Sequence, residues 1–200
     1  MDRLDVMKNL RPFQARIHNC ISRGFHDARK HHELFLHIFT KRTISSITRD
    51  YIWDYIRKEF TTEETVKFRE QQNGLCLLII NDVVFLRFKK LNTRKCSSNI
   101  PTLQATLYER QQLLMFEPRP CAHLNAGYIA NETWTNLEVY ITEPNGKRSN
   151  AWVMKIYEDE QRQSVIELPV SRTEKPRRFK PKTGTGQEQK GADNEGTRGN

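Results

Sequence analysis

The stretch Gly74–Leu91, GLCLLIINDVVFLRFKKL, decides the fold of this chain. Two apolar runs flank an Asn81-Asp82 pair, which offers a tight turn between antiparallel strands. The first run is apolar at nearly every position and predicts a strand that is covered on both faces. The second run ends in the basic letters RFKK, so the same strand leads from the core toward charge.

The residues before this stretch predict one more strand and two long helices. Alternation over Val66–Arg69 and the Asn73-Gly74 turn signal add a strand, which gives three antiparallel strands over 66–69, 75–80 and 83–90. Helical periodicity predicts helices over 12–30 and from about 43 to 60. The apolar stripe of the first helix consists of Phe13, Ile17, Cys20, Ile21, Phe25 and Ala28.

Gly24 and Trp53 lie within these two helices and each needs an explanation. Gly24 sits near the apolar stripe, where close packing against a neighbour explains it better than a break in the helix. Trp53 falls opposite the buried stripe of its helix. Two alternatives stand for it, a second contact with the body of the fold or a surface that binds a partner, and the first is favoured because large aromatic residues are mostly buried.

A helix and a second group of strands follow. Pro101 opens a helix that runs to about Leu114. The next strands are predicted over 123–130, 137–142 and 151–157, with a short edge piece at 165–170. The fold class is therefore α+β, with N-terminal helices followed by two antiparallel β-meanders separated by one helix. The sequence leaves open whether the two meanders form one sheet or two packed sheets.

Positive charge is concentrated toward the C-terminal end of the chain. The formal net charge is +9, and residues 172–200 hold eight Lys/Arg against four Asp/Glu, which gives +4 there and +5 in residues 1–171. The last 29 residues have one aromatic and almost no aliphatic side chains, so burial cannot offset the entropy of ordering them. We expect a single domain over 1–171 and a disordered basic tail over 172–200, and a basic balance favours polyanionic partners.

Cysteine use and the N-terminus point to a cytoplasmic setting. None of the four cysteines stands in a CxxC pair, so a zinc ribbon or a thioredoxin-type motif is not indicated. The start MDRLDVMKNLRPF carries acids and no long apolar run, unlike a signal peptide. No stretch approaches the length of a membrane span, and we expect no membrane partner. The sequence does not predict the oligomeric state.

Several segments together resemble a known group of sequences. They are RFKKLN at 87–92, SSNIPT at 97–102 followed by Gln104, HLNAGY at 123–128, a P-x-G turn at 144–146 and a strand containing Trp152. This pattern is similar to a family of uncharacterised bacterial proteins, over most of the chain from the second helix to Tyr157. The resemblance implies genes that accompany helix-turn-helix regulators or metallopeptidases of mobile elements, and hence a regulatory or conflict-related role. It implies no reaction and no catalytic residues.

The candidate site lies at the end of the third strand. A strand places Arg87 and Lys89 on one face and Lys90 on the other, and the first of these faces should change from buried to wet along the strand. The connection then runs to a helix start, whose free N–H groups suit phosphate. The predicted anion- or nucleic-acid-binding residues are Arg87, Lys89, Lys90, Arg94, Lys95, Ser97, Ser98, Asn99 and Thr102. The alternative is a solvated strand end followed by a loop that caps the helix.

Other chemistries find little support in the residues. Glu33 and His37 have i,i+4 spacing beside two more histidines, but HExxH is absent and no metal site is predicted. A metal-dependent nuclease needs acidic residues on the strand that carries the lysines, and Asp82 is used by the turn. We predict no catalytic residues and no cofactor.

Three functional hypotheses result. The first is a non-enzymatic binding or regulatory protein of a bacterial mobile-element or defence-type system, which contacts nucleic acid or another polyanion through the basic strand end and the tail. The second is a protein-interaction partner of a transcriptional regulator, with Trp53 and Trp134 as surface anchors. The third is an unrecognised enzyme that acts on phosphodiesters.

Overall fold

The computed structural model describes residues 1–35, 37–70, 75–97, 102–112, 121–146, 148–158 and 166–167. The chain divides into two compact units, Met1–Pro169 and Val170–Asn200. The second unit, which contains the predicted tail at 172–200, lies outside the described residues.

The N-terminal part is helical, as predicted. It consists of α1 (Arg3–Leu10), a 3-10 turn at Arg11–Phe13, α2 (Gln14–His32), a 3-10 turn at Glu33–Phe35 and α3 (Lys41–Phe60). The six predicted stripe residues are all buried, five of them on α2 and Phe13 in the 3-10 turn before it. Helix α1 was not predicted, because only Val6 and Leu10 mark its buried side and two residues make a weak periodic signal.

The favoured explanations for Trp53 and Gly24, contact with the body of the fold and close packing against a neighbour, are confirmed. Trp53 is buried, and its indole N–H donates a 2.6 Å hydrogen bond to Glu70 Oε1. Gly24 faces the backbone of α3, where a Cβ atom would come within 2.7 Å of Ile52 Cα. Glycine is therefore what allows α2 and α3 to approach closely.

The two predicted meanders form one sheet of seven strands in sequence order. Every neighbouring pair is antiparallel except β3 and β4, which are parallel. The strands are β1 (Val66–Glu70), β2 (Cys76–Ile80), β3 (Val84–Lys90), β4 (Ala122–Ala130), β5 (Leu137–Pro144), β6 (Asn150–Ile156) and β7 (Ile166–Glu167). The helix α4 (Leu103–Glu109) lies in the connection between β3 and β4, where a parallel pair requires a crossover.

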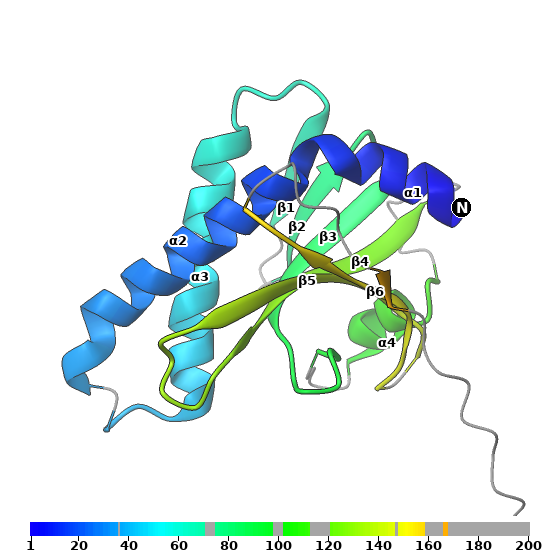
Figure 1. Cartoon of the computed structure of the whole chain (residues 1–200). Helices are drawn as coiled ribbons and strands as arrows, with labels where there is room; N and C mark the ends of the chain where they lie inside the picture. The colour runs from blue at the N-terminus through cyan, green and yellow to red at the C-terminus, as the bar shows by residue number, and fades with distance from the viewer. Residues whose placement is uncertain are drawn as a thin grey trace, which may run out of the picture. The chain divides into compact units, whose positions relative to one another are not determined.

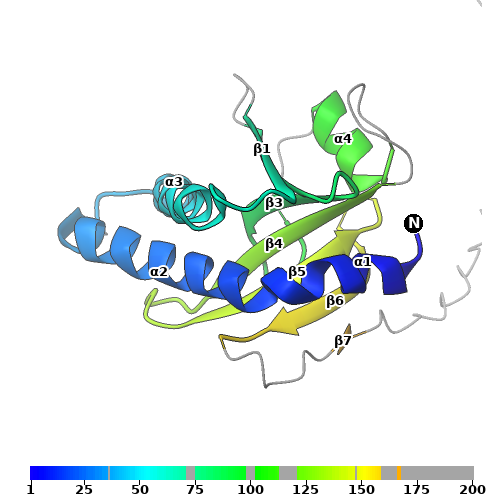
Figure 2. The ribbon, with the colours of Figure 1, turned by 90° about the horizontal axis from the view of Figure 1, so that it is seen from above.

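Helices cover the sheet from two sides (Figures 1 and 2). The N-terminal helices pack on one face, and the largest core cluster joins them to alternate residues of the strands, such as Val84, Leu86 and Phe88 of β3. The other face carries α4, whose Tyr108 packs with Leu77, Ile79 and Phe85. The central strands are therefore buried from both sides, as the continuous apolar run of β2 predicted.

The ladder between β2 and β3 is short. It covers only the pairs from Leu78↔Leu86 to Ile80↔Val84. Strand β2 continues beside β1 as far as Glu70↔Cys76, whereas β3 continues beside β4 as far as Lys90↔Tyr128. The two strands therefore diverge beyond Leu86, and the second half of β3 forms an edge that the β2 ladder does not cover.

The substitution Gly24→Ala tests the helix contact. Helix propensity alone would make alanine more stable than glycine by about 1 kcal/mol at this position. We expect the opposite sign, a loss of roughly 1–3 kcal/mol in the free energy of unfolding, because the new methyl group meets backbone that cannot move aside alone. Urea denaturation followed by circular dichroism measures this quantity. A gain in stability would contradict the close packing of α2 and α3.

Candidate functional site

Strand β3 divides its side chains between the two faces of the sheet, as the sequence predicted. Leu86 and Phe88 belong to the cluster under the N-terminal helices, and Phe85 packs with Tyr108 of α4. Arg87 lies over the ring of Tyr108, with 4.8 Å between its guanidinium carbon and the ring centroid. Arg87 and Lys89 therefore point to the α4 face, because they alternate with Leu86 and Phe88.

Arg87 is buried, whereas Lys89 and Lys90 beyond it are half-buried, so the face changes from buried to wet only after Arg87. Only 9% of the Arg87 surface is exposed, and within the described residues its Nε atom has no hydrogen-bond partner. The covering residue is Tyr108, whose hydroxyl lies 2.7 Å from the carbonyl oxygen of Phe85 and 2.6 Å from that of Leu124. The Tyr108 ring also stacks on His123, with 4.5 Å between the ring centroids. The guanidinium thus rests on a ring that is held in place from several directions.

A small cavity opens where β2 and β3 diverge. It is lined by Arg49, Trp53, Cys76, Arg87, Phe88 and Lys89, and these six residues are called the β2–β3 notch below. Its space of about 10 Å³ is room for a single water-sized group. Helix α3 contributes Arg49 and Trp53, so the notch combines two strands with a helix from a distant part of the chain.

The notch holds three cationic side chains with little compensation. Burial is the main cause that lowers the pKa of Lys89 to about 8, and the charges of Arg87 and Arg49 lower it further. Burial also lowers the pKa of Arg87, partly offset by Tyr108 and Glu109. Within the described residues neither Arg87 nor Lys89 forms an ion pair, and Arg49 pairs only with Asp50 beside it. Two cations without an ion pair, beside a third that is partly exposed, are unusual at a largely buried position and suit an anion.

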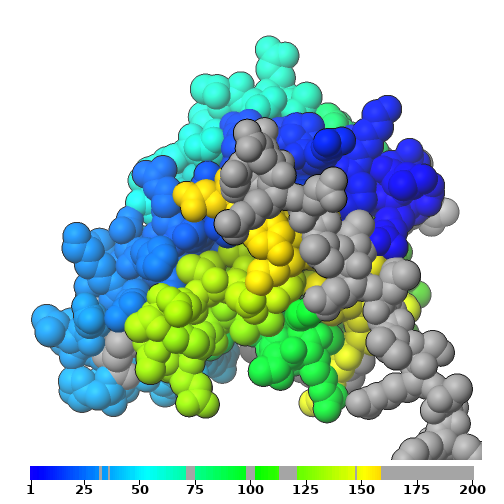
Figure 3. Space-filling model, in the orientation of Figure 1, coloured from blue at the N-terminus to red at the C-terminus, as the bar shows by residue number. Residues whose placement is uncertain are grey.

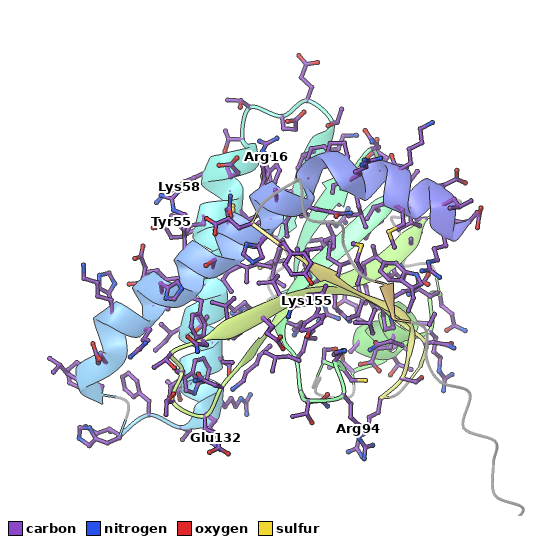
Figure 4. The ribbon with its side chains drawn as sticks, in the orientation of Figure 1. Arg16, Tyr55, Lys58, Arg94, Glu132 and Lys155 are labelled. Atoms are coloured by element: carbon purple, nitrogen blue, oxygen red, sulfur yellow. The ribbon has the colours of Figure 1, made fainter. Side chains whose placement is uncertain are left out.

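The remaining predicted cations are not part of the notch. Lys90 points to the opposite face, with its Nζ atom 4.0 Å from the ring centroid of Trp134. Lys95 lies over Tyr140, 5.0 Å from its ring centroid. Arg94 is exposed in the turn after β3 and points away from the ribbon in Figure 4. The basic run at 87–95 is therefore continuous in the sequence but divided in space among separate places.

The polar connection after β3 serves mainly to hold structure. Ser97 forms an isolated bridge with Leu91, and Ser98 and Asn99 lie outside the described residues. Thr102 caps α4, since its Oγ1 atom accepts a 3.1 Å hydrogen bond from the N–H of Ala105. Helix α4 begins at Leu103 and has seven residues, so it is shorter than the helix predicted from Pro101 to Leu114. The described part of this connection thus caps α4, and the anion-binding role of Ser97, Ser98, Asn99 and Thr102 stays a prediction.

The end of α4 is fixed by one glutamine. Gln111 takes a positive φ of 56°, which ends the helix. Its side-chain Nε2 atom donates to the carbonyl oxygens of His123 and Pro144, and its Oε1 atom accepts from the N–H of His123. This contact ties α4 to β4 and β5, and so holds Tyr108 over Arg87.

The described residues do not assemble a catalytic centre at the notch. Burial raises the pKa of the Cys76 thiol, which keeps it protonated and a poor nucleophile. Asp82 forms an ion pair with Lys67 at 2.7 Å. Within the described ranges no group of three or more His, Cys, Asp or Glu residues could hold a metal ion. The arrangement is suited to binding a negative group.

Comparison with known proteins adds no family. No protein-family model matches the chain, and neither a curated protein nor a solved structure matches it. No helix within the described ranges combines the length and the apolar character that a bilayer crossing needs.

Lys89→Met tests the electrostatic cost of the notch. At pH 7 we expect the free energy of unfolding of the variant to be higher by roughly 1–3 kcal/mol, because a half-buried charge beside two like charges is removed. The variant should therefore unfold at a higher denaturant concentration. Between pH 8 and about 10.5 the unfolded chain binds more protons at this lysine than the folded chain, so the stability of the unmodified protein should rise with pH there. The advantage of the variant should shrink over the same window.

Lys67→Met is the matched control for this measurement. It removes an exposed lysine from a surface ion pair and should change stability by less than about 1 kcal/mol. A Lys89→Met protein that is less stable at pH 7 would mean that the charge is compensated in the folded state.

Proposed function

We propose that this protein is a non-enzymatic binding protein for nucleic acid or a similar polyanion, and that the β2–β3 notch receives one negative group of the ligand. The observation that carries the proposal is the convergence of Arg49, Arg87 and Lys89 with no carboxylate paired to Arg87 or Lys89 among the described residues. Phosphate is the ligand group that best combines negative charge with several acceptor oxygens for such a cluster.

Positive charge elsewhere in the chain also supports nucleic acid or a similar polyanion as the partner. The net charge is +9, and the sequence KPRRFKPK at 175–182 adds a basic segment beyond the described residues. Such segments strengthen binding to nucleic acid through the release of counterions. The regulatory setting in a mobile-element or defence-type system is the role that the sequence resemblance implies, and it is part of this proposal.

Neutralising two notch cations tests the proposal. In mobility-shift titrations at several salt concentrations, the double substitution Arg49→Gln and Lys89→Gln should weaken DNA or RNA binding. It should also reduce the slope of log K against log salt by about one for each lost phosphate contact. Arg94→Gln is the matched control, because this exposed arginine lies outside the notch and should change the slope less.

Two further measurements separate the alternatives. A chain that ends at residue 171 shows how much of the affinity comes from the basic tail. Cleavage of a labelled oligonucleotide in the presence of Mg²⁺ would replace the binding role with an enzymatic one. An unchanged affinity and salt slope in the double variant would remove the notch from the binding surface.

A second candidate function is binding of a regulator protein, and a different surface favours it. The proposed anchors Trp53 and Trp134 are buried and are not available to a partner. Three large apolar side chains are instead exposed where α2 leads into α3, namely Leu34, Phe35 and Ile38. This end of α2 forms the left edge of the coloured surface in Figure 3. Exposed apolar groups that cluster in this way are typical of protein-binding surfaces.

The double substitution Leu34→Ser and Phe35→Ser tests the second candidate. It should leave the free energy of unfolding nearly unchanged, because both side chains are exposed. It should abolish co-purification with a helix-turn-helix regulator encoded beside the gene. Leu103→Ser, at an equally exposed leucine on α4, is the control and should retain the complex. Retention by both variants would exclude this surface.

A further inference from the structure

Arg87 is left unsatisfied even though a neutral acceptor lies beside it. Asn125 is its register partner on β4, and Thr142 is the partner of Asn125 on β5. All three side chains are at least nine-tenths buried, and Arg87 Nε, Asn125 Oδ1 and Thr142 Oγ1 have no hydrogen-bond partner among the residues that the structure describes. Buried polar atoms without partners are rare in folded proteins, and each one requires an explanation. The fold thus keeps a guanidinium at the notch with a ring contact but with its Nε donor unused.

The shape of the notch restricts what can reach this guanidinium. The cavity has room for one water-sized group, and the side chains of Trp53 and Phe88 form part of its wall. A phosphate inside a nucleic-acid strand carries a sugar on both sides, and both sugars would have to lie against the walls. A phosphate at the end of a strand carries only one substituent and can insert its free oxygens.

The charges of the two phosphate types also distinguish a terminal phosphate from an internal one. An internal phosphodiester carries one negative charge, whereas a phosphate monoester carries about −1.5 to −2 at neutral pH and has three free oxygens. Three cations line the notch, from α3 and β3. The monoester therefore compensates more of the positive charge around the notch when one of its oxygens enters the water-sized space. Planar guanidinium groups such as those of Arg49 and Arg87 also bind two phosphate oxygens at once.

We infer that the notch recognises a terminal phosphate monoester, such as the phosphorylated end of a nucleic-acid strand, in preference to internal phosphodiesters. This inference rests on the proposed function and names the part of the ligand that the notch selects. Binding along the strand by the other basic residues supplies general affinity, and the notch supplies preference for the end. Lys89 must be charged for this preference, so it should weaken as the pH rises through about 8.

Competition with matched oligonucleotides tests the inference. The full-length protein is titrated with one short single strand in 5′-phosphorylated, 3′-phosphorylated and unphosphorylated forms, and affinity is measured by fluorescence anisotropy. At least one phosphorylated form should bind tenfold or more tightly than the unphosphorylated form. Adenosine monophosphate should compete for this difference, and adenosine should not.

Variants connect the preference to the notch. Lys89→Gln should reduce the ratio of affinities for the phosphorylated and unphosphorylated strands toward one, whereas Lys89→Arg should keep the ratio and extend it above pH 8. Arg94→Gln should lower both affinities by a similar factor or leave them unchanged. Equal binding of all strands by the unmodified protein would overturn the inference and leave the proposed function standing. Failure to bind any of them would overturn the proposed function itself.

Discussion

A buried arginine on the third strand is the constraint around which the rest of this sheet is arranged. Moving a guanidinium from water into a protein interior costs several kcal/mol unless other groups compensate it. Here the compensation among the described residues is a cation–π contact with Tyr108, which contributes on the order of 1–2 kcal/mol. The fold therefore accepts a local cost at Arg87, and the surrounding apolar core must supply the stability that offsets it.

The order of the strands explains how Arg87 comes to be both buried and accessible to the notch. The parallel step from β3 to β4 sends the chain through α4, which places Tyr108 over Arg87 on one side. The divergence of β2 from β3 opens the other side, where α3 delivers Arg49. A longer β2–β3 ladder would cover this edge with backbone and close the notch. The short ladder is thus a structural feature with a consequence for binding.

Much of the fold could be predicted from local patterns, and much of the site could not. The alternation along β3 correctly separates Arg87 and Lys89 from Lys90, because the period of a strand is fixed by its geometry. Burial of Arg87 depends on Tyr108, and the third cation, Arg49, lies on a helix that precedes the whole sheet. The sequence around residue 87 predicts neither the cover by Tyr108 nor the approach of Arg49. The basic run at 87–95 indicated one surface, but the turn after β3 sends Arg94 and Lys95 to another place.

Under the proposed function, the cost of the charges at the notch has an explanation in ligand binding. A structural arginine in a sheet normally gains a carboxylate or several carbonyl partners, since an apolar residue of equal size would otherwise be more stable. Arg87 has neither among the described residues, and Lys89 beside it raises the cost through repulsion. Two like charges that destabilise each other in the free protein gain the most when an anion arrives, because the ligand removes both the repulsion and the lack of hydrogen-bond partners. Under the proposed function, the cost of the uncompensated charges at the notch would be offset when a ligand of high negative charge binds.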